Sequence, residues 1–397
     1  MRDLEVLSDG HLKMKFSEWK DFFEQELVEQ VRAQLKALIE KALEAERDYY
    51  LQFGFYEHAP QFRFDYRNGC YFRDFATRLG LLRRLRIPRT RKGFRSQILP
   101  RYQRRQAAVN ELVRQAFLRG ISTRQVGEVL EPVLGEAYSA QTVSNITREL
   151  DHAVQQFHRR PLREQYVYLF LDGVVLKVRD TTGSVRRRVI LVAYGITAQG
   201  RREVIDYQFA INGESEAAWT EFLQNLFLRG LEGKPLRLII SDGGKGLQAA
   251  LPLVFPRIPV QLCWAHKLRN IADKVPKKEG SCVAEAAAIY RSASKSEAQK
   301  AFQDWKRRWE SRRPQAVACI ERDLDALLNF FAVPEGHWKK VRTTNVIERA
   351  FREVRRRTRP MSSFSTVESC DRIVFGVVSH LNRSWERKPL PEFTQHA

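Results

Sequence analysis

The amino-acid sequence predicts an α/β fold class, in which a mixed β-sheet is flanked by helices, on the basis of three observations. Runs rich in β-branched and aromatic residues follow one another across short loops in the middle of the chain. Further runs of this kind then alternate with amphipathic segments, which favours a sheet with both antiparallel and parallel neighbours. The segments on either side have helical periodicity and predict additional helical regions.

A long helix is expected over residues 17–53. Its apolar side chains recur every three or four positions, with charges between them, at Trp19, Phe23, Leu27, Val31, Leu35 and Leu38. Such an apolar stripe packs either against the rest of the chain or against a helix of a second copy, and both alternatives stay open.

Basic residues dominate the next segment and the chain as a whole. The formal net charge is +21, which favours a polyanionic partner, most simply nucleic acid, over a surface charge that only aids solubility. Residues 83–105 contain no acid, and prolines and a glycine interrupt ten basic residues: Arg83, Arg84, Arg86, Arg89, Arg91, Lys92, Arg95, Arg101, Arg104 and Arg105. A run of one sign suits a phosphate backbone, and short extended pieces are expected there.

Residues 106–150 are expected to form helices around a turn. One of them begins with a cap at Ser139 and turns Val143, Ile146 and Leu150 inward. Its outward side chains are then polar: Gln141, Thr142, Ser144, Asn145 and Arg148. Polar residues near a helix N-terminus suit base edges and phosphates, as in a helix-turn-helix, although this turn is longer than usual. The alternative is a helical pair that binds nothing.

The predicted sheet has five strands, at 166–178, 186–197, 202–211, 236–241 and 258–264. Short loops join the first three, so these should pair as an antiparallel meander. A capped amphipathic helix over 214–230 follows the meander, and another helix lies between the last two strands. This order matches a ribonuclease-H-like core. Residues 281–332 and 343–386 are expected to be helical.

Aspartates lie at two of the predicted strands. Asp172 lies late in the first strand and Asp242 ends the fourth, which is where active residues of open α/β sheets collect. Neighbouring carboxylates repel, and a divalent cation such as Mg²⁺, which takes oxygen ligands, removes that cost. Each aspartate also has a structural alternative, because Asp172–Gly173 could be a hairpin turn and Asp242 an ordinary strand-to-helix connection.

A third acid lies in the basic C-terminal part. In a helical projection, Glu348 shares a face with Arg352, Arg355 and Arg359, as a metal-and-phosphate site would require. The alternative is a capping box, in which Asn345 and Glu348 satisfy each other's backbone groups.

Cys263 and His266 form a Cys-x-x-His pair. It could be half of a zinc site, but such sites need four ligands, so a structural or DNA-contacting role is favoured. The five cysteines are scattered and odd in number, which favours a reducing compartment. The N-terminus lacks a signal peptide's apolar stretch, and no run approaches the ~18 apolar residues of a spanning helix. The expected location is the cytoplasm, with association to the nucleoid and no membrane partner.

Several of these segments together resemble one family. The stretches "YLFLDGVVLKVR", "LIISDGGKGLQAAL", "CWAHKLRNIADKVPKK" and "HWKKVRTTNVIERAFREVRRRTRPMSSF" are similar to motifs of the bacterial and archaeal Mutator-type insertion-sequence transposases. The N-terminal stretches "RNGCYFRDFATRLG" and "YQRRQAAVNELVRQAFLRGISTRQVGEVLE" also look like that family. The resemblance covers roughly residues 65 to 386, and the motifs are in the family's order.

The resemblance implies a DDE-type transposase with a ribonuclease-H-like core and an all-helical insertion. The acidic triad would be Asp172, Asp242 and Glu348, which would hold two Mg²⁺ ions, with Mn²⁺ able to replace them. Residues expected to position DNA near the scissile phosphate are Arg352, Arg355 and Arg356. The family's Cys-x-x-His signature falls on Cys263 and His266. Family members often carry a histidine where this chain has Gly244.

The resulting organisation has five regions. They are 1–60, a helical dimerisation region; 61–160, a basic and helix-turn-helix-like DNA-binding region; 161–274, the first part of the core; 275–340, the helical insertion; and 341–397, the C-terminal helices with the catalytic glutamate. The expected partner is double-stranded DNA, as transposon ends and as target, and no small-molecule substrate is expected. A homodimer is expected because two ends must be held together.

Two other functions stay open at this stage. One is a catalytically silent DNA-binding regulator derived from a transposase, which the presence of all three acids disfavours. The other is a nuclease with the same core that does not transfer strands.

Overall fold

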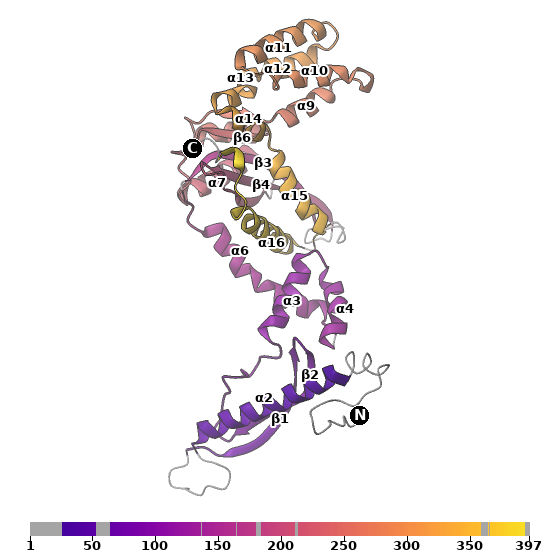
Figure 1. Ribbon diagram of the computed structural model, residues 1–397, viewed down its shortest axis with the longest axis vertical. Helices are drawn as coiled ribbons and strands as arrows, with labels where there is room; N and C mark the ends of the chain where they lie inside the picture. The colour runs from indigo at the N-terminus through magenta and orange to yellow at the C-terminus, as the bar shows by residue number, and fades with distance from the viewer. Residues whose placement is uncertain are drawn as a thin grey trace, which may run out of the picture. The chain divides into compact units, whose positions relative to one another are not determined.

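The computed structural model describes residues 26–52, 64–135, 137–163, 165–179, 184–210, 213–358, 364 and 366–393. The chain divides into two compact units, one formed by residues 1–117 and 121–148 and the other by 118–120 and 149–397. Each unit has its own hydrophobic core. Figure 1 labels most of the helices and strands of both units.

The first unit begins with helix α2 (Leu27–Leu51), which packs on an antiparallel hairpin of strands β1 (Arg67–Thr77) and β2 (Gly80–Thr90). The core between them contains Leu43, Phe75, Leu82, Leu85, Ile87 and Leu99. Burying these apolar side chains against one another stabilises the unit, because each removes apolar surface from water.

The N-terminal helix predicted over residues 17–53 is confirmed in its described part, and residues 17–25 and 53 lie outside the described ranges. Leu35 of the predicted apolar stripe packs against the hairpin core. Leu38, from the same stripe, stays 65 % exposed. Packing within the chain therefore accounts for only part of the stripe.

The hairpin differs from the short extended pieces that the sequence predicts. Strand β2 continues past Pro88 to Thr90 and pairs with β1 along its length, with two interruptions of the register. A strand with a single neighbour tolerates a proline, because the missing N–H need not serve a second strand. Gly80 closes the turn with φ +110°, a backbone conformation that glycine adopts readily and other residues rarely do.

Three further helices follow the hairpin: α3 (Ala107–Leu118), α4 (Thr123–Leu134) and α5 (Ala140–Arg148). The hydroxyl of Ser122 caps α4 by accepting a hydrogen bond from the amide of Gln125. Val143 and Ile146 of α5 are buried, as the sequence predicts.

The second unit contains a mixed five-stranded sheet, which confirms the predicted sheet. Its strands are β3 (Tyr166–Arg179), β4 (Val185–Thr197), β5 (Arg202–Ala210), β6 (Leu238–Ser241) and β7 (Val260–Leu262). Their spatial order is β5-β4-β3-β6-β7. The first three pair antiparallel as the predicted meander, and β6 runs parallel to both β3 and β7.

Helices cover both faces of this sheet. On one face, α7 (Glu216–Leu228) and α8 (Lys245–Val254) contribute large apolar side chains to the core. The other face meets α6 (Leu150–Arg159), α15 (Asn345–Thr358) and α16 (Val367–Glu386), which contact β3 or β5. The central strand β3 is therefore buried on both sides, which is why it reads as an almost continuous apolar run.

A group of helices extends the second unit beyond the sheet. They are α9 (Trp264–Ala272), α10 (Ser281–Ile289), α11 (Lys295–Trp309), α12 (Pro314–Glu321), α13 (Leu324–Leu327) and α14 (Glu335–Val341). Helices α10 to α13 gather together (Figure 1), which confirms the helical prediction for 281–332. Within the described ranges, no helix has both the length and the apolar character needed to cross a membrane.

Candidate active site

Asp172 lies on the central strand β3. Leu169 and Leu171 belong to the core under α7 and α8, so the two-residue period of a strand places Asp172 on the opposite face, which α15 contacts. The side chain is 3 % exposed, and its Oδ2 is buried with no hydrogen-bond partner. A buried carboxylate oxygen without a hydrogen-bond partner destabilises the fold. The alternative of a hairpin turn at Asp172–Gly173 is wrong, because β3 continues to Arg179.

The charge state of Asp172 reflects its surroundings. Burial raises the pKa of Asp172 to about 7, and the negative charges of Asp242 and Glu348 act in the same direction. The positive charge of His266 and a hydrogen bond with Thr344 oppose the shift. Asp242 and Glu348, which are distant from Asp172 in the sequence, are therefore close enough to act on its carboxyl group.

Asp242 directly follows strand β6 in a tight turn. Its Oδ1 accepts a hydrogen bond from the amide of Gly244 at 2.9 Å, and Gly243 adopts φ +85°, which favours glycine. The pairing of β6 with β3 ends at Leu171 and Ser241, so Asp242 lies just beyond the last paired residue. The turn thus presents the carboxylate at the carboxyl end of a parallel strand.

Glu348 lies in the first turn of α15. The buried side chains of Ile347, Ala350, Phe351 and Val354 fix the helix against the rest of the unit. The Oε1 atom of Glu348 accepts a hydrogen bond from Arg269 on α9 at 2.6 Å, and Nε2 of His266 lies 3.7 Å away. The carboxylate is thus directed toward α9.

The Cys-x-x-His pair lies between these acids. The amide of Thr344 donates to Sγ of Cys263 at 3.2 Å, and Oγ1 of Thr344 lies 3.4 Å from Nδ1 of His266. A hydrogen bond with Cys263 raises the pKa of His266 to about 9, with the charge of Asp172 contributing. A protonated imidazole therefore faces Asp172 and Glu348 and offsets part of their mutual repulsion.

The acids are neighbours without forming one coordination site. Among the described residues, no three His, Cys, Asp or Glu side chains form a group that could hold a metal ion as they stand. Neither the predicted triad nor Cys263 and His266 with a further ligand forms such a group among the described residues. The ion pair between Glu348 and Arg269 holds one of the three carboxylates in another direction.

Sequence reasoning missed a fourth acid, Glu214, which precedes α7. Its Oε1 accepts a hydrogen bond from the indole N–H of Trp219 at 2.9 Å. Burial of the carboxyl end raises the pKa of Glu214, although much of the residue is exposed, and the charge of Asp242 adds to the shift. The only sequence signal was its position after the third strand, which does not distinguish it from an ordinary surface residue.

The predicted DNA-contacting residues of the first unit lie partly around one hollow. This cavity of about 730 Å³ is lined by basic residues that include Arg89, Lys92 and Arg104, together with Tyr71 and Phe72. Arg84, Arg89, Arg91 and Arg105 each lie over an aromatic ring, 4.9 to 5.9 Å from its centre. Arg86 instead forms an ion pair with Glu44, and Arg83 is exposed on β2.

The predicted polar face of α5 is present. Gln141, Asn145 and Arg148 are exposed, and the amide of Gln141 donates to Oδ1 of Asn145 at 3.0 Å. Thr142 is half-buried, and its hydroxyl lies 3.0 Å from that of the cap residue Ser139. The arginines of α15 that were expected to position DNA are exposed: Arg352, Arg355 and Arg356.

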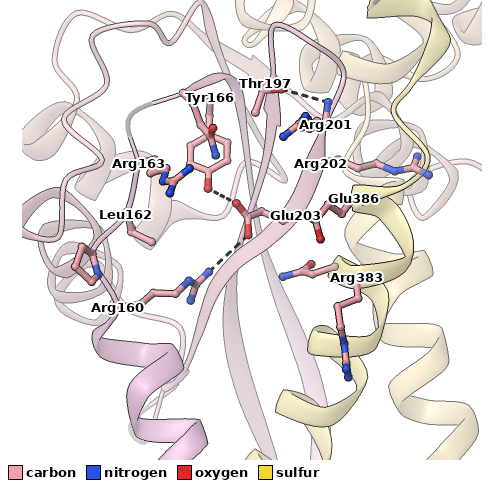
Figure 2. Close-up of a pocket in the computed structure, with 13 residues that line it drawn as sticks. Arg160, Leu162, Arg163, Tyr166, Thr197, Arg201, Arg202, Glu203, Arg383 and Glu386 are labelled. Atoms are coloured by element: carbon pink, nitrogen blue, oxygen red, sulfur yellow. Dashed lines mark hydrogen bonds and ion pairs between the residues drawn. The ribbon is translucent and has the colours of Figure 1, made fainter.

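A separate hollow of about 420 Å³ lies at the beginning of strand β3 (Figure 2). Its arginines are Arg160, Arg163, Arg201, Arg202 and Arg383. Glu203 points into it, accepts a hydrogen bond from the hydroxyl of Tyr166 at 2.5 Å and lies 3.8 Å from Arg160. It contains none of the predicted site residues, so the hollow is distinct from the carboxylate site.

The known proteins that are similar to this chain are transposases of insertion sequences. The transposase for ISRM5 of Rhizobium meliloti (strain 1021) is 36 % identical over 357 residues, or 89 % of this chain and 88 % of the relative. The transposase for IS256 in transposon Tn4001 of Staphylococcus aureus is 33 % identical and covers 96 % and 97 %. The transposase for IS905 of Lactococcus lactis subsp. lactis (strain IL1403) is 31 % identical and covers 90 % of both.

The particular family follows from a match to the family model. Residues 8–388 match the model described as "Transposase, Mutator family", and the chain belongs to that family. The resemblance inferred from the sequence motifs is therefore confirmed.

Proposed function

We propose that this transposase is of the DDE type: it cuts DNA at the ends of its element and transfers the freed strands to a target, with Asp172, Asp242 and Glu348 as catalytic carboxylates. The transposase function follows from family membership and the named relatives. One observation supports the residue assignment above others. Asp172 is buried with an unpartnered oxygen on the central strand, and its pKa responds to both other acids.

The donor set fits a hard divalent cation. Carboxylate oxygens are the ligands that Mg²⁺ prefers, and the buried oxygen of Asp172 lacks any other partner in the described structure. The chemistry expected from two bound Mg²⁺ ions, or from Mn²⁺ in their place, is activation of a water or 3′-hydroxyl and stabilisation of the leaving oxygen. Asp172, Asp242 and Glu348 would hold these ions once Glu348 exchanges its present partners.

The chain's own side chains would prepare this site for DNA. Arg269 and His266 lie beside Glu348, and their positive charge would limit its repulsion with the other acids until the ions bind. The exposed arginines Arg352, Arg355 and Arg356 follow Glu348 on α15 at helical spacing, where they can hold backbone phosphates. Water and phosphate would thus meet at the end of β6, where Asp242 is presented.

Other features support the finer parts of the proposal. A central strand with Asp172, a parallel neighbour followed by Asp242 and an antiparallel meander support a ribonuclease-H-like core. The polar face of α5 supports a helix-turn-helix-like reader of the DNA ends.

We also propose a homodimer with α2 at the contact, because Leu38 is 65 % exposed. Sedimentation of the purified chain as a monomer would contradict that assembly.

The decisive experiment removes one negative charge from the site. We expect Asp242→Asn to abolish strand cleavage in Mg²⁺ while the protein still binds a duplex that carries the terminal inverted repeat of its element. The amide keeps the shape of the side chain but is a much poorer ligand for a hard cation. A gel that resolves bound, cut and joined DNA provides the measurement.

A matched control variant is Asp273→Asn, which changes an exposed aspartate at the end of α9 in the same way. It should cut and join like the unmodified protein. Undiminished nicking by Asp242→Asn would discard the residue assignment. Cutting without joining by the unmodified protein would instead indicate a nuclease, and binding alone would indicate a silent regulator.

A further inference from the structure

Glu214 is held in place by the core of the second unit. It lies immediately before Ser215, whose hydroxyl caps α7, and its Oε1 accepts a hydrogen bond from the indole of Trp219 at 2.9 Å. Trp219 is fully buried beneath the sheet. A fixed donor and a capped helix start therefore orient this carboxylate, in contrast to a freely rotating surface glutamate.

Two glycines create the space for this carboxylate. A Cβ on Gly173 would lie 2.6 Å from Oε2 of Glu214, and a Cβ on Gly244 would lie 3.2 Å from Oε1. The same point on Gly244 is 3.3 Å from Oδ1 of Asp242. Glu214 therefore lies next to Gly173, the residue that follows Asp172. Its carboxylate and that of Asp242 both lie close to Gly244.

The end of strand β6 explains how these acids meet. Pairing of β6 with β3 stops at Ser241 and Leu171, so the sheet edge is open where Asp172 and Asp242 lie. Asp172 approaches this edge from the α15 face. Glu214 approaches it from the face that α7 covers, because Gly173 and Asp172 point to opposite sides of β3.

A carboxylate fixed beside Asp242 increases repulsion unless a cation is shared. An independent sign of such a cation is Asp172, which is 3 % exposed and has a buried oxygen with no partner. Among the cations that act on these acids are His266 and Arg269, and Arg269 is already paired with Glu348. Oxygen donors from three chain segments at this sheet edge are of the kind that a hard divalent ion takes. As they stand they do not form a group that could hold the ion, so binding requires their side chains to turn toward one another.

We infer that Glu214 is a fourth carboxylate of the divalent-cation site, and that it binds Mg²⁺ or Mn²⁺ together with Asp172 and Asp242. This inference rests on the proposed function, because it extends the same site. It assigns to the start of α7 a role in metal binding that is separate from that of Glu348 on α15.

Binding of Mn²⁺ to the full chain without DNA tests the inference. The electron paramagnetic resonance signal of free Mn²⁺ falls as the ion binds, so titration gives a Kd without any measurement of activity. We expect Glu214→Gln to weaken Mn²⁺ binding by about tenfold, in the range seen when a residue that supports a metal site is removed. The amide oxygen still accepts from Trp219, so thermal unfolding without metal should be unchanged.

Two companion variants make the result specific. Glu216→Gln removes an equal charge from the same helix start, at an exposed residue, and should leave the Mn²⁺ affinity unchanged. Asp242→Asn reports on the site itself and should lower the affinity strongly. In addition, strand cleavage by Glu214→Gln should recover as Mn²⁺ is raised about tenfold, because only occupancy is impaired.

The outcomes separate this inference from the function on which it rests. A normal Mn²⁺ affinity in Glu214→Gln, together with a loss in Asp242→Asn, would overturn the role of Glu214 alone. Normal affinity in both variants would overturn the inference together with the proposed metal site. A similar loss in Glu214→Gln and Glu216→Gln would also overturn it, since the effect would then reflect charge rather than position.

Discussion

His158 shows at the scale of one residue how this chain links distant elements through charge. Its Nδ1 lies 2.7 Å from Asp206 on β5, and its Nε2 lies 3.4 Å from Asp371 on α16. Arg229 also pairs with Asp206, which is buried. The two hydrogen-bonded aspartates outweigh burial and raise the pKa of His158 to about 9. A protonated imidazole thus joins α6, β5 and α16 at neutral pH.

This arrangement predicts how stability depends on pH. The pKa of His158 is higher in the folded chain than its unfolded value of 6.5, so its stabilisation is complete below pH 6.5 and is lost as the pH rises through about 9. The loss should be on the order of 3 kcal/mol at most, since one pKa unit corresponds to about 1.4 kcal/mol. Urea denaturation between pH 6 and pH 10 would measure it.

The matching variant is His158→Gln, which can still hydrogen-bond but does not titrate in this range. Its free energy of unfolding should be lower at pH 6, and its decline toward pH 10 should be smaller than that of the unmodified chain. Two parallel pH profiles would show that the imidazole does not carry a stabilising charge. The exposed His152 on the same helix, changed in the same way, provides the control.

At this scale the sequence predicts some residues of the proposed site much better than others. Asp172 and Asp242 can be predicted from the strand pattern, because an acid late in an apolar run, or directly after one, is unusual. This signal can be recognised within a few neighbouring residues. Glu348 follows from helical spacing. Glu214 could not be predicted, since its place depends on Trp219 reaching back from the core and on two glycines leaving room. Such contacts have no local signature.

At the scale of elements, two sequence features explain which predictions succeed: the periodicity of the apolar residues and the clarity of the breaks between segments. The meander was predictable because β3, β4 and β5 are apolar runs with clear breaks between them. The β1–β2 hairpin was not, because a register shift lies between Arg73 and Phe75 and Arg84 adopts φ 51° opposite it. This irregularity breaks the two-residue alternation from which a strand is recognised.

The close crossing of α4 with the segment that enters α5 yields a further prediction. A Cβ on Gly127 would lie 2.0 Å from the backbone oxygen of Tyr138, so one of the two must move. Alanine favours a helix over glycine by about 1 kcal/mol, but overpacking against backbone costs about 1–3 kcal/mol. We therefore expect Gly127→Ala to destabilise the helix pair and to weaken binding to DNA.

Thermal unfolding and a DNA-binding titration together provide the measurement. Glu128→Ala, at the neighbouring exposed position of α4, should leave both quantities nearly unchanged. A more stable Gly127→Ala protein would mean that helix propensity outweighs the clash and that the two segments separate easily.

At the scale of the whole molecule, the net charge of +21 admits two explanations. Charge dispersed over the surface would attract any polyanion at long range, and salt would screen this attraction. Charge gathered at a surface that follows the phosphate backbone releases condensed counterions, so that the logarithm of the affinity falls by about 0.9 per neutralised phosphate for each unit of log salt. The hollow of the first unit gathers Arg89, Lys92 and Arg104 in this way.

Two triple variants with the same loss of charge distinguish these explanations. Replacing Arg89, Lys92 and Arg104 by alanine should lower the slope of log affinity against log salt by about 2 to 3, if each holds one phosphate of a random duplex. Changing the exposed residues Lys295, Lys300 and Arg312 to alanine lowers the net charge equally, in the helices beyond the sheet. Their slope should change little, because charge at a distance from the DNA releases few counterions. Equal changes in the two proteins would instead mean that total charge, rather than the basic hollow, governs the attraction to DNA.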